Sequence, residues 1–235
     1  MANLPTVSQK TITALDEAAS AGQLTTSTAG GQFARALATA NAVSTLRELL
    51  TKDVMANVMQ LQNTALGFLT DRRDAPYSVD VVRDALIEAV LNGVSPIGNE
   101  FNIISGRCYI TKNGMRRKLS NIEGLSYTIT PGIPKLAEKG AVIVMSIDWT
   151  YQGKTEHKDL AIPVRVNAGM GTDAIIGKAT RKASAWLYDA VTGTCINDGD
   201  VSDGDAIPVE AKSVTSPIEA DNHVEDVPAD GTLPM

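Results

Sequence analysis

The sequence predicts an α+β fold: N-terminal helices, then a central small β-sheet of hairpins with an inserted short basic helix, then a closing C-terminal helix and a disordered acidic tail. The chain has 235 residues and is 43% hydrophobic, which is enough for one sizeable core. Apolar residues recur at helical spacing before residue 92 and in short strand-like runs between residues 101 and 166. We therefore expect a flexible arm over residues 1–31, a single core over residues 32–196 and a disordered tail over residues 197–235.

The first part of the chain is predicted to be helical. Residues 1–30 are rich in Ser, Thr, Ala and Gly and are typical of a mobile arm with room for one short helix. The segment 32–70 is rich in Ala and Leu, contains no proline and favours one or two helices. Ser78 is a good N-cap for a further helix, which should stop at Gly93.

The middle of the chain changes to short strands and turns. The expected strands are Phe101–Ile104, Cys108–Thr111, Leu125–Thr130, Ala141–Tyr151 and Asp159–Val166. The pair Gln152-Gly153 predicts a hairpin between the last two strands. A short basic helix from Gly114 to about Asn121 fits between the second and third strands. The closing helix should run from Asp173 to Val191, with Gly193 as its stop.

Charge is distributed unevenly along the chain. The net charge is −6, but residues 101–187 hold 13 basic and 6 acidic residues, a net of +7. Residues 197–235 hold ten acidic residues and one basic residue, a net of −9. A basic centre followed by an acidic tail points to a nucleic acid or another anionic partner. The alternative is an ordinary basic face with a solubilising tail.

Several classes of protein are disfavoured by composition. Two cysteines, Cys108 and Cys195, cannot build a disulfide framework, and a reducing compartment is expected. The first ten residues lack the apolar segment of a secretory signal, and we expect no membrane association because the apolar stretches are short. With only two histidines, His157 and His223, the sequence argues against most histidine-based catalysis and metal chemistry.

The closing helix carries the clearest functional pattern. Its apolar residues fall on one arc of the helical wheel, and three cations, Lys178, Arg181 and Lys182, fall together on the neighbouring arc at i, i+3 and i+4. Such a helix can bury one stripe and lay its cations along a phosphate backbone. The alternative is a solvated polar flank, which most surface helices possess.

A second group of candidate nucleic-acid contacts surrounds the short basic helix. Cations supply charge for phosphates, and a tyrosine in the preceding strand supplies a ring for base stacking. The residues are Arg107, Tyr109, Lys112, Arg116, Arg117 and Lys118. The alternative for the tyrosine is a role in the core of its strand.

Three further patterns suggest small ligands. Gly169, Gly171 and Thr172 open the closing helix in a dinucleotide-like pattern, but no second strand follows, so a dinucleotide fold is rejected and a helix N-terminus that favours a phosphate is kept. The segment 153–155 is similar to the end of a P-loop but lies in a hairpin without the first glycine, and an ATPase is rejected. Acidic residues around His157 on the same hairpin are interpreted as solvated side chains rather than as a metal site.

Two stretches together resemble the phage single-strand DNA annealing proteins of the RecT/Redβ type. The first is Leu91-Asn-Gly-Val-Ser-Pro followed by Asn99-Glu-Phe-Asn-Ile-Ile-Ser-Gly-Arg-Cys-Tyr-Ile-Thr-Lys-Asn-Gly114; the second is Asp173-Ala-Ile-Ile-Gly-Lys-Ala-Thr-Arg-Lys182. The similarity covers residues 78–192 and depends on order and spacing more than on identity. This chain has fewer aromatic residues after the hairpin, and a basic segment follows Gly114 where the family has a mostly apolar helix.

The resemblance implies a recombinase that binds single-stranded DNA and anneals a complementary strand without ATP, and that is not an enzyme with a hydrolytic active site. It implies Lys178, Arg181 and Lys182 as DNA-backbone contacts, a homo-oligomeric ring or helical filament, and annealed duplex as product. It further implies a phage 5′–3′ exonuclease and a host single-strand binding protein as partners, in the cytoplasm of a bacterial host. No cofactor is implied, and a modulating role for Mg²⁺ is left open. The alternatives are a phage structural or assembly protein that oligomerises without DNA, and a small nucleotide-linked enzyme.

Overall fold

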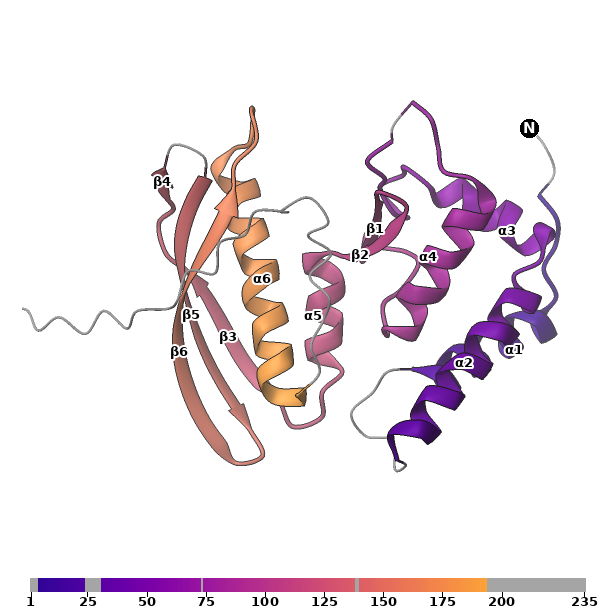
Figure 1. Cartoon of the computed structure of the whole chain (residues 1–235), viewed down its shortest axis with the longest axis horizontal. Helices are drawn as coiled ribbons and strands as arrows, with labels where there is room; N and C mark the ends of the chain where they lie inside the picture. The colour runs from indigo at the N-terminus through magenta and orange to yellow at the C-terminus, as the bar shows by residue number, and fades with distance from the viewer. Residues whose placement is uncertain (1–3, 24–30, 73, 138–139, 194–235) are drawn as a thin grey trace, which may run out of the picture. The chain divides into compact units, whose positions relative to one another are not determined.

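The computed structural model describes residues 4–23, 31–72, 74–137 and 140–193, and it confirms the predicted α+β class (Figure 1). All of these residues belong to one compact unit, Met1–Val201. The predicted disordered tail and Cys195 lie outside the described residues. Among the described residues, no helix has both the length and the apolar character needed to cross a membrane.

Helices form the first part of the described chain. Their bounds are Gln9–Gly22 for α1, Gln32–Leu49 for α2, Lys52–Val58 for α3 and Val79–Leu91 for α4, with a 3₁₀ turn, Met59–Leu61, after α3. The helix α1 lies where we expected an arm with room for one short helix. It is capped by the Ser8 hydroxyl, which accepts from the N–H of Thr11 at 3.2 Å. At its other end Gly22 lies so close to Ala42 and Leu91 that a side chain there would overlap both.

A β-hairpin and a short helix follow α4. The strands β1, Phe101–Ile104, and β2, Arg107–Ile110, pair antiparallel around a Ser105-Gly106 turn in which both residues have positive φ. The helix α5, Lys112–Ser120, begins two residues after β2 and is capped by Thr111. Gly114 lies against the backbone of Glu100, and a methyl group there would overlap the carbonyl oxygen of Glu100. The sequence therefore needs a glycine where α5 crosses the end of the hairpin.

The larger sheet has four antiparallel strands. They are β3, Ser126–Pro131; β4, Lys135–Ala137; β5, Gly140–Tyr151; and β6, Lys154–Arg165. The central strand β5 pairs with β6 along its whole length on one edge, and with β3 and then β4 on the other. The predicted hairpin at Gln152-Gly153 is confirmed, with φ of 50° and 76°. The short strand β4 was not predicted, and β6 begins five residues before the predicted start.

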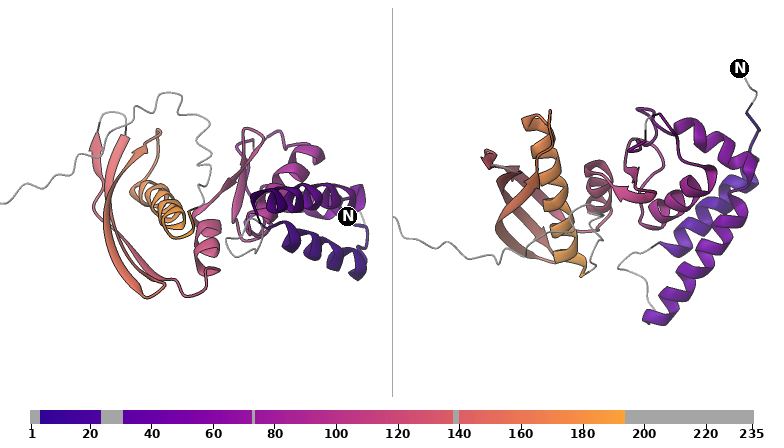
Figure 2. Two further views of the ribbon diagram at one scale, coloured as in Figure 1. Left: turned by 60° about the horizontal axis from the view of Figure 1, so that its bottom comes forward. Right: turned by 45° about the horizontal axis from the view of Figure 1, so that its top comes forward.

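The closing helix α6, Thr172–Thr192, covers one face of this sheet (Figures 1 and 2). Alternate residues of β5 are buried on the face that α6 covers, and one apolar stripe of α6 is buried with them. Trp149 of β5 meets Trp186 of α6 edge to face, with ring centroids 5.6 Å apart. Gly193, with φ of +65°, ends the helix as predicted. The helix α5 packs beside α6.

Candidate nucleic-acid interface

The structure separates the three cations that the helical wheel placed together on α6. Arg181 is buried, with 4% of its surface exposed. Its Nε donates to the carbonyl oxygen of Ile110 at 2.7 Å, and its guanidinium lies 4.1 Å from the centre of the Tyr109 ring. This cation therefore joins α6 to the end of β2, which places it in the interior rather than along a surface groove. Tyr109 is half-buried in the same contact.

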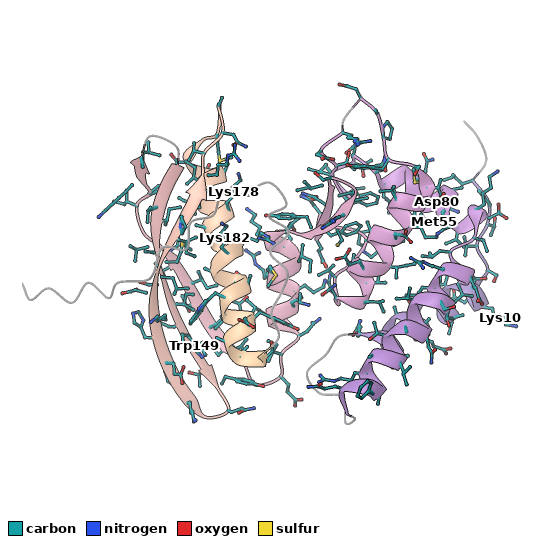
Figure 3. The ribbon with its side chains drawn as sticks, in the orientation of Figure 1. Lys10, Met55, Asp80, Trp149, Lys178 and Lys182 are labelled. Atoms are coloured by element: carbon teal, nitrogen blue, oxygen red, sulfur yellow. The ribbon has the colours of Figure 1, made fainter. Side chains whose placement is uncertain are left out.

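Lys178 and Lys182 lie on a different flank of α6, next to the edge of β6 that no other described strand pairs with (Figure 3). Their Nζ atoms are each 3.4 Å from a backbone carbonyl oxygen, of Arg165 and Pro163 respectively. Pro163 has no N–H to offer on this edge, and lysines beside an edge strand discourage pairing with another chain. A contact of this length is weak, so the ammonium group of Lys178 is able to turn toward a ligand.

Lys112 approaches the same helix from α5. The side chain is exposed, and its Nζ lies 4.0 Å from the position that a Cβ would occupy at Gly177, the residue before Lys178. We call Lys112, Lys178 and Lys182 the basic surface. These lysines come from two elements that are some 60 residues apart in the sequence and surround the first half of α6.

Two further predicted contacts are occupied within the fold. The Nε of Arg117 donates to both carboxylate oxygens of Glu100 at 2.6 Å, and Glu100 also accepts from the N–H of Ser95. Lys118 is 6% exposed, and its Nζ donates to the carbonyl oxygen of Asn92, at the C-cap of α4, at 2.9 Å. Burial lowers the pKa of Lys118 to about 8. Both residues hold α5 in place, and neither belongs to the basic surface.

Lys118 also lies over an aromatic ring. Its Nζ is 4.6 Å from the centre of the Tyr188 ring, and burial raises the pKa of the Tyr188 hydroxyl.

The two remaining predicted cations, Arg107 on β2 and Arg116 on α5, are exposed. Burial raises the pKa of the neighbouring Glu88 carboxyl, and the charge of Arg107 partly offsets that rise.

The N-terminus of α6 is the predicted phosphate-facing element. Gly169 has φ of +79°, and Gly171 is the N-cap with extended backbone, its carbonyl oxygen accepting from Ala174 and Ile175. Gly169, Gly171 and Thr172 are all exposed. The carboxylate of Asp173 lies in the same first turn, where it stabilises the helix and opposes a second negative charge.

On the exposed face of the β5–β6 hairpin, four polar side chains contact one another: Ser146, Asp148, His157 and Asp159. The Nδ1 of His157 is 2.8 Å from Asp148, and its Nε2 is 3.4 Å from Asp159, so the two ring nitrogens face different carboxylates. The hydroxyl of Ser146 donates to Asp159 rather than to the imidazole. Among the described residues, no group of three or more His, Cys, Asp or Glu side chains is arranged to hold a metal ion. The cluster agrees with the prediction of solvated hairpin residues.

The remaining thiol and the clefts offer few reactive groups. Burial raises the pKa of Cys108 to about 12, so this half-buried thiol stays protonated. One cleft of about 340 Å³ lies around Lys118 and Tyr188. A second, of about 270 Å³, lies between α2 and α4. Neither cleft includes a residue of the basic surface.

Sequence reasoning missed the partners that hold these predicted cations within the fold. Glu100 is separated from Arg117 by a whole hairpin, and Asn92 lies on another helix from Lys118. For Arg181, the sequence did contain a signal of burial. Arg181, Ser184 and Tyr188 are spaced at i, i+3 and i+7, so they share one face of α6, and all three are buried where α5 packs beside α6.

The comparisons with known proteins do not identify the chain. No family model matches the sequence, and neither the curated proteins nor the solved structures contain a match.

Proposed function

We propose that this protein binds single-stranded DNA and anneals complementary strands without ATP, as the sequence resemblance implied. The observation that carries the proposal is the basic surface, in which Lys112, Lys178 and Lys182 gather from α5 and α6. Among the residues that the structure describes, no acidic side chain forms an ion pair with Lys112 or Lys178. These ammonium groups therefore keep their charge available for phosphates.

The chemistry of annealing suits a surface of this kind. Two phosphate backbones must be neutralised while the base edges stay available for pairing, and this needs cations but no nucleophile. Lysine ammonium groups on flexible stems accept many phosphate positions, which suits a ligand of any sequence. The weak contact of Lys178 with the carbonyl oxygen of Arg165 on β6 can be exchanged for a phosphate contact.

Fluorescence-polarisation titration of a single-stranded oligonucleotide over a salt series tests binding. Three lysine–phosphate contacts give a slope of log affinity against log salt of about −2, a loss of roughly 20-fold between 50 and 200 mM salt. The double variant Lys112→Ala/Lys178→Ala should reduce this slope to about −0.7. The control Lys154→Ala/Lys158→Ala removes two exposed cations of β6 outside the basic surface and should leave the slope near that of the wild type.

Annealing is tested by adding the complementary strand without ATP and following duplex formation against the oligonucleotides alone. We expect faster annealing with the wild type and with the control variant. The proposal is wrong if the wild type does not bind at low salt, or if both double variants lose the same affinity.

The second candidate is an assembly or structural protein whose oligomers need no DNA. It is favoured by exposed apolar side chains on α2, where Phe33 is 87% exposed and Leu37 is 64% exposed. This candidate predicts the same oligomer with and without DNA and no effect of the basic-surface variants, so the experiment above separates the two.

A further inference from the structure

The first turns of α2 expose large apolar side chains to solvent. Phe33 and Leu37 are one turn apart on the same face of the helix, at 87% and 64% exposure. Small residues, Ala36 and Ala40, lie between and after them and are exposed as well. A single exposed apolar residue needs no explanation, but a run along one helix face is typical of a contact surface.

A cleft begins on the same helix two turns later. It has a volume of about 270 Å³ and lies between α2 and α4. Its apolar walls are Val43, Ile87 and Leu91, and the ion pair between Arg47 and Asp84, at 3.2 Å, lies at its rim. The cleft is open, and aliphatic side chains from both helices form much of its lining.

Phe33 cannot enter the cleft of its own chain. Both features belong to one continuous helix, and the ten residues from Phe33 to Val43 place them about 15 Å apart along its axis. Phe33 can reach such a cleft only on a second molecule. The exposed residues and the cleft can therefore meet only between two copies of the chain.

Sequence spacing fixes how two such helices would meet. Phe33, Ala40 and Arg47 recur every seven residues and share one face of α2. If two copies of α2 run antiparallel with Ala40 on the two-fold axis, Phe33 lies opposite Arg47 of the second copy and Leu37 lies opposite Val43. Both of these opposite positions line the cleft.

We propose that two copies of this chain associate through antiparallel α2 helices, with Phe33 and Leu37 of each copy seated in the α2–α4 cleft of the other. The contact is self-complementary, as a two-fold interface requires. Alanine at the crossing point allows the two helices to approach closely. The proposal does not depend on DNA binding.

Charge and area agree with this arrangement. The N-cap of α2 is Gly31, which has no side chain to cap the helix, and the positive end of the helix dipole favours a nearby anion. In the dimer this end approaches the carboxylates of Asp84 and Glu88, which line the cleft of the other copy. Two phenylalanines and two leucines with their cleft walls bury roughly 1,200 Å², near the lower limit for a specific interface, so the dimer should dissociate on dilution.

Disulfide cross-linking of the full chain tests the register. In a Cys195→Ser background, Ala40→Cys places two thiols together at the two-fold axis, within the Cα separation that a disulfide needs. Ala38→Cys is the matched control, because Ala38 is equally exposed but points about 160° away around the helix. Under mild oxidation in the absence of DNA, we expect a covalent dimer from the first variant at least ten times faster than from the second.

The partner residues give a second measurement. Phe33→Asp in the Ala40→Cys chain should suppress cross-linking, and Phe33→Asp in the wild type should give a monomer in sedimentation equilibrium at concentrations where the wild type is dimeric. Phe33 is exposed, so this change leaves the fold intact, which circular dichroism verifies. Equal cross-linking at the two cysteine positions, or a wild type that is monomeric at high micromolar concentration, would overturn the proposal.

Discussion

The burial of Arg181 leads to the most decisive prediction about the closing helix. In the variant Arg181→Met the side chain keeps its length and loses the guanidinium. The change removes the 2.7 Å hydrogen bond to the Ile110 carbonyl and the contact with the Tyr109 ring at 4.1 Å. A hydrogen bond to a charged donor contributes about 1.5–3 kcal/mol, and a desolvated cation–π contact about 2 kcal/mol.

These contributions are partly offset because a buried cation costs free energy to desolvate. We therefore expect the free energy of unfolding to fall by about 2–4 kcal/mol in Arg181→Met. For a unit of this size, the midpoint of thermal unfolding should then fall by roughly 5–15 °C. The variant Arg181→Lys keeps the charge but loses the planar group, and it should lie between the wild type and Arg181→Met.

Urea denaturation followed by tryptophan fluorescence measures this loss, because Trp149 and Trp186 lie in the contact between α6 and the sheet. DNA binding by the folded variant is measured separately, at a temperature well below its midpoint. A variant with wild-type stability that loses the salt-dependent part of DNA binding would refute the structural role. It would restore Arg181 as a phosphate contact, as the helical wheel predicted.

Three further results are expected. Gly114→Ala should cost about 1–3 kcal/mol in urea denaturation because a methyl group there overlaps a backbone carbonyl, whereas the control Gly177→Ala has room and should be neutral or stabilising. Burial lowers the pKa of Lys118 from 10.5 to about 8, so the charged form of this side chain destabilises the folded state at neutral pH. Between pH 8 and pH 10.5, the free energy of unfolding of the wild type should rise by up to about 3 kcal/mol relative to that of Lys118→Met. The hydrogen bond with Asp148 raises the pKa of His157 above 6.5. The charged imidazole therefore stabilises the fold below pH 6.5, and this contribution is lost as the pH rises through the raised pKa. In Asp148→Asn, the pKa of the His157 ring, measured by NMR, should move back toward 6.5.

The fold class could be predicted because local signals were strong. Gln152-Gly153 forms a two-residue turn with positive φ at both positions, which is typical of a β-hairpin. Gly193 ends α6 in the left-handed conformation that glycine favours. The alternation along β5 gave the buried face of the sheet directly. The strand β4 escaped prediction because its three residues are all exposed, so hydrophobic patterning gives no signal there.

The candidate site was harder because a cation has the same sequence signature whether it is buried or exposed. A helical wheel gives the angle at which Lys178, Arg181 and Lys182 leave α6, but it does not give what lies opposite each angle. The neighbour that buries Arg181 is the end of β2, some 70 residues away in the sequence. The approach of Lys112 to Gly177 depends equally on how α5 packs beside α6. Neither fact is present in local spacing.

The division between buried and exposed cations has a consequence for how the basic surface is held. Lys118 and Arg117 fix α5 to the end of α4 and to the start of β1, and Arg181 fixes α6 to the end of β2, just before α5 begins. Because these contacts set the position of α5 and of α6, they hold the exposed Lys112 beside α6. A variant that breaks one of the three internal contacts should therefore weaken DNA binding indirectly, by displacing Lys112. Loss of Lys112 or Lys178 should weaken binding with no change in the free energy of unfolding. Measuring both quantities for each variant separates cations that contact DNA from cations that only position them.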